Sequence, residues 1–278
     1  MELHDPWWKF FEHQWRLSFF RARQQRCASI FYIHAQTTKG YIPGIQTLNL
    51  FISHGALQDS AARDPPPRCL PGTRKKEKKI IMRWIKEPNP RSSVFLIQGH
   101  TRVEQTAFMQ TIAEQLQAEN RQPYACFFFK RGVVGCDNMD QLFSTLAYQL
   151  AINIPSMREH IEQAMMEDPA LPMRSAATQL QKLIIIPFKL LPTPRSSSSL
   201  IFIIDGLDEC EGKDSQEAFL TLISQVLEDS AVTIQFIVSG LQGHEYERVR
   251  GAGGCLVLDP DSKIRVAIYM SNCALLFY

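Results

Sequence analysis

The sequence predicts an α/β fold: a three-layer sandwich with a mostly parallel sheet between helices, preceded by a helical or irregular N-terminal extension. Four short, almost wholly apolar runs have the composition of buried parallel strands, and they cover residues 94–97, 125–129, 200–204 and 233–238. Segments with helical spacing separate these runs, which is typical of a parallel sheet. Polar motifs directly follow the first and third runs, at the sheet edge where such folds bind ligands.

Helices are expected between these strands. The first of them places Phe108, Ile112 and Leu116 on one face. The predicted helices span residues 104–119, 138–151, 156–167, 173–189 and 214–229, with a loop at 192–199. A fifth strand is expected at 256–258.

The composition excludes several classes of protein. The chain has 278 residues, of which 45% are hydrophobic and 21% charged, so it can form a sizeable core. Its net charge of +2 is too small to indicate nucleic-acid binding through bulk electrostatics. The seven cysteines lack C-x-x-C spacing, which argues against a zinc site or a disulfide framework and favours a cytoplasmic location. We find no signal peptide and no apolar run long enough to span a bilayer.

The chain divides into four predicted parts. Residues 1–53 are an aromatic-rich extension. Its segment 7–20 either contacts a membrane surface or partner, or it packs on the main body or is a poorly ordered leader. The irregular apolar spacing favours the last two interpretations over a membrane or partner contact. Residues 54–92 are a linker and a leading helix, and residues 93–260 are the α/β core. Residues 261–278 are a short C-terminal segment that suggests a truncated chain.

The linker and leading helix have different compositions. Prolines crowd residues 63–73 and disfavour helix there. A charge run at 74–79 then leads into apolar positions with helical spacing at 80, 81, 84 and 85. We interpret the charge run as the solvated face of that helix rather than as a nucleic-acid contact.

The polar motif after the first strand matches part of a phosphate-binding loop. The pattern G-x-x-x-x-G-K-[ST] surrounds phosphate groups with backbone amides and a lysine, and places a hydroxyl on Mg²⁺. Here Glu104 and Gln105 replace the second glycine and the lysine, whereas the first glycine and the hydroxyl are present. The predicted nucleotide-binding residues are Gly99, His100, Thr101, Arg102, Val103, Glu104, Gln105 and Thr106.

Three acids follow the third strand. Asp205 ends the apolar run, as does the carboxylate that holds Mg²⁺ in phosphoryl-transfer enzymes, so the predicted metal ligands are Thr106 and Asp205. Asp208 and Glu209 lie one short turn further on, where a carboxylate can orient an attacking water in an active enzyme. An ordinary polar turn is the alternative, but neighbouring carboxylates repel one another unless a cation or a function keeps them together.

The chain resembles the NACHT class of STAND P-loop NTPases, in the nephrocystin-like form abundant in fungi. The resemblance runs from about residue 54 to 269 and includes C-L-P-G-T-R at 69–74 and I-D-G-L-D-E-C at 204–210. Further matching segments lie at 54–68, 110–114, 127–132, 142–151, 158–164 and 181–188. It implies a switch that ADP holds closed and that ATP lets oligomerise. It also implies that ATP, ADP or GTP binds with Mg²⁺ at 99–106, with residues 63–74 near the adenine.

Several departures from this family weaken the expected nucleotide site. Gln105 lacks an ammonium group whose pairing with phosphate is worth about 4 kcal/mol at an effective dielectric of about 20, or roughly three decades of affinity. Glu104 adds a side chain and a negative charge where the backbone should approach phosphate. Gly240 occupies the position where the family usually has an arginine that senses the γ-phosphate. The sequence also stops before the helical domains and repeat sensor of such proteins.

These observations favour a nucleotide-switch domain that lacks efficient hydrolysis, has weak or lost ATP or GTP binding, and acts through protein–protein association. One alternative is an active NTPase switch that tolerates the changes in its loop. Another is a non-enzymatic adaptor that docks on a membrane or a partner. The expected partners are copies of this chain or related STAND proteins, and not nucleic acid.

Overall fold

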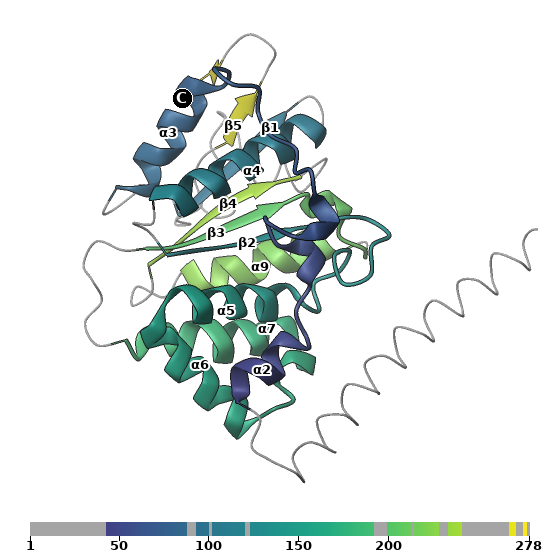
Figure 1. Ribbon diagram of the computed structural model, residues 1–278, viewed down its shortest axis with the longest axis vertical. Helices are drawn as coiled ribbons and strands as arrows, with labels where there is room; N and C mark the ends of the chain where they lie inside the picture. The colour runs from purple at the N-terminus through teal and green to yellow at the C-terminus, as the bar shows by residue number, and fades with distance from the viewer. Residues whose placement is uncertain are drawn as a thin grey trace, which may run out of the picture.

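The computed structural model describes residues 43–87, 93–99, 102–119, 123–191, 199–212, 214–227, 233–240, 267–270 and 275–276 (Figure 1). The expected aromatic segment at 7–20, the expected strand at 256–258 and most of the expected loop at 192–199 lie outside these residues. No described helix is long and apolar enough to cross a membrane.

The sheet has the strand order β2–β3–β4–β1–β5–β6. All neighbouring pairs are parallel except β5 with β6. The strands are β1 (Val94–Gly99), β2 (Tyr124–Phe128), β3 (Leu200–Asp205), β4 (Ile234–Ser239), β5 (Ala267–Met270) and β6 (Leu275–Leu276). The four apolar runs are therefore confirmed as parallel strands. The sheet also continues beyond residue 260, where the sequence placed the end of the core.

Helices cover both faces of the sheet, which confirms the three-layer α/β sandwich (Figure 1). Helices α3 (Lys75–Ile85) and α4 (Arg102–Glu119) pack on one face. The other face is covered by α5 (Leu142–Asn153), α6 (Pro155–Glu167) and α9 (Ser215–Leu227). Side chains alternate along each strand, so that on β1 Phe95 and Ile97 face the first layer while Val94 and Leu96 face the second. A strand buried on both sides must be apolar throughout, which explains the runs in the sequence.

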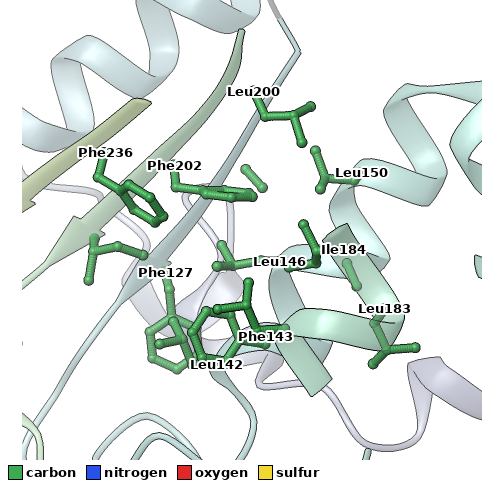
Figure 2. Packing of buried hydrophobic residues seen from close by; sticks show 14 of the residues in the cluster. Phe127, Leu142, Phe143, Leu146, Leu150, Leu183, Ile184, Leu200, Phe202 and Phe236 are labelled. Atoms are coloured by element: carbon green, nitrogen blue, oxygen red, sulfur yellow. The ribbon is translucent and has the colours of Figure 1, made fainter. Parts of the chain in front are cut away.

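The larger core cluster lies between the sheet and α5 (Figure 2). The rings of Phe202 and Phe236 from β3 and β4 are 5.4 Å apart, and Phe219 of α9 meets Phe236 edge-on at 6.3 Å. All three rings are completely buried. Aromatic pairs at such distances add about 0.5–1.5 kcal/mol beyond the area that they bury.

The helix predicted at 173–189 is interrupted. A short 3-10 helix (Leu171–Met173) is followed by α7 (Ala176–Gln179), a π-helical segment (Leu180–Ile185) and α8 (Ile186–Lys189). Pro187 lies just beyond the π-helical segment and cannot donate a backbone hydrogen bond. The wider π turn accommodates the proline ring. The predicted helix is therefore present from residue 176 to 189, with a π-helical middle that the sequence did not indicate.

Part of the predicted N-terminal extension belongs to the main body. Helix α2 (Gly44–Asn49) packs on α6 and α5, and Ile45 and Leu48 lie in the larger core cluster. A Cβ on Gly44 would lie 2.6 Å from the carbonyl oxygen of Glu162 in α6, so the helices approach closely here. Residues 44–52 of the predicted extension therefore pack on the main body. The packing predicted for segment 7–20 falls outside the described residues and stays a prediction.

Candidate functional site

The candidate site lies where β1, β3 and β4 end and α4 begins. Strand β1 ends at Gly99 and α4 starts at Arg102, so a helix N-terminus faces the carboxyl edge of the sheet. Such helix ends favour anions. Of the predicted loop, His100 and Thr101 lie outside the described residues, and side chains are described only from Glu104 to Thr106. The strand–loop–helix arrangement predicted for residues 94–119 is present.

Asp205, at the end of β3, is the centre of a buried polar cluster. Asp205 is only 2% exposed. The Ser239 hydroxyl donates a hydrogen bond of 2.6 Å to Asp205 Oδ1. Ser239 Oγ also accepts a 3.0 Å hydrogen bond from the backbone amide of Gly206. The Thr106 side chain hydrogen-bonds the same carboxylate from α4. The two residues predicted as metal ligands are thus in contact, because parallel strands and the following helix bring their ends to one sheet edge.

Burial raises the pKa of Asp205 to about 6, with a smaller contribution in the same direction from Glu209. Hydrogen bonds from Ser239 and Thr106 and the positive charge of Arg63 act in the opposite direction. A carboxyl group in this position loses water and gains only partial compensation. A divalent cation would favour its charged form, since hard cations select carboxylate and hydroxyl oxygens.

Asp208 and Glu209 lie in a tight turn held by the segment after β2. Gly206 has a φ of 70° and leads into a 3-10 turn at Leu207–Glu209. Arg131 binds this turn twice: its Nη2 donates to the Asp208 carbonyl at 2.6 Å, and its backbone amide donates to Glu209 Oε2 at 3.0 Å. Asp208 is 7% exposed. The three acids therefore remain at one sheet edge, as the sequence indicated.

Glu104, the residue in place of the second loop glycine, takes part in an ion pair. Arg74 Nη2 lies 3.4 Å from Glu104 Oε2, and Arg74 Nη1 lies 3.6 Å from Glu77 Oε1. Arg74 itself has a φ of 53°, which an L-residue seldom adopts. The family-like segment C-L-P-G-T-R thus ends beside the start of α4, next to the predicted phosphate loop, where its arginine contacts the Glu104 carboxylate.

The segment from Gln58 to Arg74 runs along α4, and we call it the strap. Its contacts with α4 include Arg63 Nη2 to Gln110 Oε1 at 3.0 Å, Arg68 Nε to Glu114 Oε2 at 2.8 Å, and the Cys69 amide to Thr111 Oγ1 at 3.1 Å. The Gln110 side chain in turn donates to the Gln58 carbonyl at 3.0 Å. Gln58 Nε2 also donates to the Tyr124 hydroxyl of β2 at 2.8 Å, so the strap connects α4 to β2.

Arg63 is a site residue that sequence reasoning did not single out. Its guanidinium carbon lies 3.7 Å from the ring centroid of Phe128, and Phe128 is the register partner of Asp205 on the adjacent strand. Its Nε is buried without a hydrogen-bond partner among the described residues. Burial lowers the pKa of Arg63, while Asp205 acts to raise it. The sequence signals are its place at the start of the proline-rich linker and the resemblance, which implied only that the whole segment 63–74 lies near the adenine.

Gly240 closes the other side of the site. It follows β4 with a φ of 85°, and a Cβ there would lie 2.6 Å from the Leu207 amide nitrogen and 2.9 Å from that of Asp208. The Asp208 carboxylate would also clash with it. Strand β4 and the acidic turn are thus in direct contact where the family usually has an arginine.

The sheet order, the strand–loop–helix at 94–119 and the strand that ends in Asp205 define an α/β protein with a P-loop-like sandwich fold. A family model described as Nephrocystin 3, N-terminal matches residues 75–240. The chain belongs to this NACHT-associated family, which confirms the nephrocystin-like resemblance. Searches of the curated proteins and of the solved structures found no match.

The raised pKa of Asp205 predicts a pH-dependent stability. The pKa is about 6 in the folded protein and 3.8 for the ordinary side chain, so the folded state holds the proton more tightly. Protonation of Asp205 therefore contributes fully to the free energy of unfolding below pH 4. This contribution, about 3 kcal/mol at most, is lost as the pH rises through 6. Asp205→Asn should remove this loss, so the variant should gain stability relative to the native chain as the pH rises from 4 to 7.

Urea unfolding at pH 4.5, 6 and 7.5 without divalent cations measures this effect. Ser239→Ala serves as the companion variant, because it removes a hydrogen bond to the charged form and should steepen the loss. If the stability of the native chain and that of Asp205→Asn changed equally with pH, the raised pKa of Asp205 in the folded protein would be contradicted.

Proposed function

We propose that this chain is a nucleotide-switch domain of the NACHT type, in which the metal half of the site is retained and the phosphate half is impaired. It hydrolyses ATP or GTP slowly or not at all, and acts through association with copies of itself or with related proteins. Membership of a NACHT-associated family supports the switch. The observation that carries the impairment is the Arg74–Glu104 ion pair at the start of α4.

The residues at the site fit Mg²⁺ better than they fit phosphate. The Thr106 hydroxyl and the Asp205 carboxylate are adjacent oxygen donors, which is the chemistry that Mg²⁺ prefers. In the loop, by contrast, a carboxylate replaces glycine and an amide replaces the lysine. Glu104 repels a polyphosphate, and the cation Arg74 at this end of α4 is already engaged with it. We therefore assign Thr106 and Asp205 to the cation and expect Gln105 to hold phosphate poorly.

Direct binding tests this proposal. A fluorescent ATP analogue titrated with Mg²⁺ into the full chain should show no saturable binding at micromolar concentrations. An unrelated intact P-loop NTPase provides the positive control for the analogue. Micromolar binding by the native chain would refute the impaired site and favour the active-switch alternative, in which Asp208 and Glu209 are the catalytic carboxylates.

A further inference from the structure

The outer face of α3 concentrates positive charge. Seven of the 30 cationic residues of the chain, but only one of its 28 acidic residues, lie between 74 and 86. The rest of the chain therefore has a net charge of −4. Helix α3 is fixed in place because Ile81 and Ile85 are buried and because Gln235 of β4 donates to the Trp84 carbonyl at 3.1 Å. The charge is thus presented on a rigid, folded surface.

These cations surround a hollow between α3 and the C-terminal half of α4, which we call the basic hollow. Its volume is about 450 Å³, and its lining includes Lys75, Lys78, Lys79, Arg83, Lys86 and Glu119. Glu119 holds Lys86 by an ion pair of 2.8 Å. The other four cations have no ion-pair partner within the part of the chain that the structure describes.

The cations of the basic hollow repel one another unless an anion binds between them. Lys75, Lys79 and Arg83 succeed one another at intervals of four residues, and like charges at that spacing destabilise a helix. A solvated helix face normally mixes signs, and a local rule broken without an internal compensation is typical of a functional surface. The hollow has the size of a small-molecule site.

We propose that the basic hollow binds a compact, multiply phosphorylated anion, such as an inositol polyphosphate or the phosphoinositide headgroup of the same chemistry. A single hollow flanked by four uncompensated cations suits clustered phosphates rather than a dispersed negative charge. No exposed aromatic side chain lies on α3, since Trp84 is buried, so the surface lacks the stacking platform of a single-strand nucleic-acid site. No large apolar side chain of α3 is exposed either, so a lipid would be recognised by its headgroup alone.

Two arms of one experiment distinguish the sources. Inositol hexakisphosphate is titrated into the full chain by calorimetry, and vesicles that contain phosphatidylinositol bisphosphate are tested by flotation against phosphatidylserine vesicles of equal charge. We expect saturable binding of the soluble anion, weakened roughly tenfold or more between 50 and 200 mM salt. If the chain floats with phosphoinositide vesicles but not with phosphatidylserine vesicles, the ligand is the lipid headgroup. If it floats with neither but binds inositol hexakisphosphate, the ligand is the soluble anion.

Matched variants test the location. Lys79→Glu with Arg83→Glu should weaken binding on the order of a hundredfold, because each change removes a cation and adds a repulsive charge. The control is Lys76→Glu with Lys182→Glu, which has the same charge change on exposed residues outside the hollow and should retain most of the binding. Circular dichroism checks that both variants fold. Asp205→Asn should leave the affinity unchanged, which separates the hollow from the nucleotide site.

Three results would overturn the proposal. The first is absence of binding to both the soluble anion and the phosphoinositide vesicles. The second is an equal loss of binding in the hollow variant and its control. The third is tighter binding of an RNA oligonucleotide than of inositol hexakisphosphate, which would make the surface a nucleic-acid site instead.

Discussion

Replacing Glu104 with glycine and Gln105 with lysine is expected to tighten the binding of a Mg²⁺–ATP analogue by about a thousandfold. The lysine supplies an ammonium group near the β- and γ-phosphates, worth about 4 kcal/mol at an effective dielectric of about 20. The glycine removes a carboxylate and frees Arg74 from its 3.4 Å ion pair. Glycine in the first turn of α4 costs about 1 kcal/mol of helix stability, which the fold should tolerate. Fluorescence titration measures the gain.

Two further variants show whether the gain arises at the site. Glu159→Gln with Gln163→Lys adds the same charge on the exposed face of α6 and should leave nucleotide affinity as it is in the native chain. Adding Asp205→Asn to the restored loop should remove the dependence of binding on Mg²⁺, because the carboxylate beside Thr106 is lost. If the restored loop binds no better than the native one, the strap or the loop backbone, rather than these two side chains, limits the site.

Gly240→Ala is expected to destabilise the protein by about 2–5 kcal/mol. An alanine with φ near 85° costs about 1–2 kcal/mol, and forcing a methyl group into a packed contact costs about 1–3 kcal/mol more. The contact here is with the backbone nitrogens of Leu207 and Asp208, which cannot rotate away. The arginine usual in the family should be less tolerated still. The shift of the urea unfolding midpoint at constant slope measures the loss.

Gly132→Ala is the matched control for this prediction. Gly132 has a similar φ of 72°, but nothing lies within 4 Å of a Cβ placed there. It should therefore show the cost of backbone strain alone, about 1–2 kcal/mol. Equal losses at the two positions would mean that the acidic turn moves aside readily, and that an arginine at 240 is sterically permitted.

The sheet was predictable because its strands are buried on both faces. Strands β1, β3 and β4 are apolar at nearly every position, and this alone separates them from amphipathic helices. The proximity of Thr106 and Asp205 was predictable for a related reason, since parallel strands place their carboxyl ends at one edge. Whether those residues hold nucleotide stays a prediction.

The unpredicted features depend on contacts between distant residues. Arg63 reaches Phe128 and the neighbourhood of Asp205 only because the strap folds along α4, and nothing local to Arg63 signals this. The Arg74–Glu104 pair spans 30 residues and needs the same folded path. The sequence A-I-Y-M at 267–270 has no strong strand signal, and its pairing with β1 is a tertiary effect.

The position of β1 in the sheet also constrains how the chain folds during its synthesis. β1 pairs only with β4 and β5, which lie about 140 and 170 residues further along the chain. At a synthesis rate of about 5–20 residues per second, the first of these partners leaves the ribosome roughly 7–28 seconds after β1. During that interval the most central strand of the domain has two open edges, and open apolar edges pair readily with other chains. We expect the nascent chain to need protection by chaperones until β4 has been synthesised.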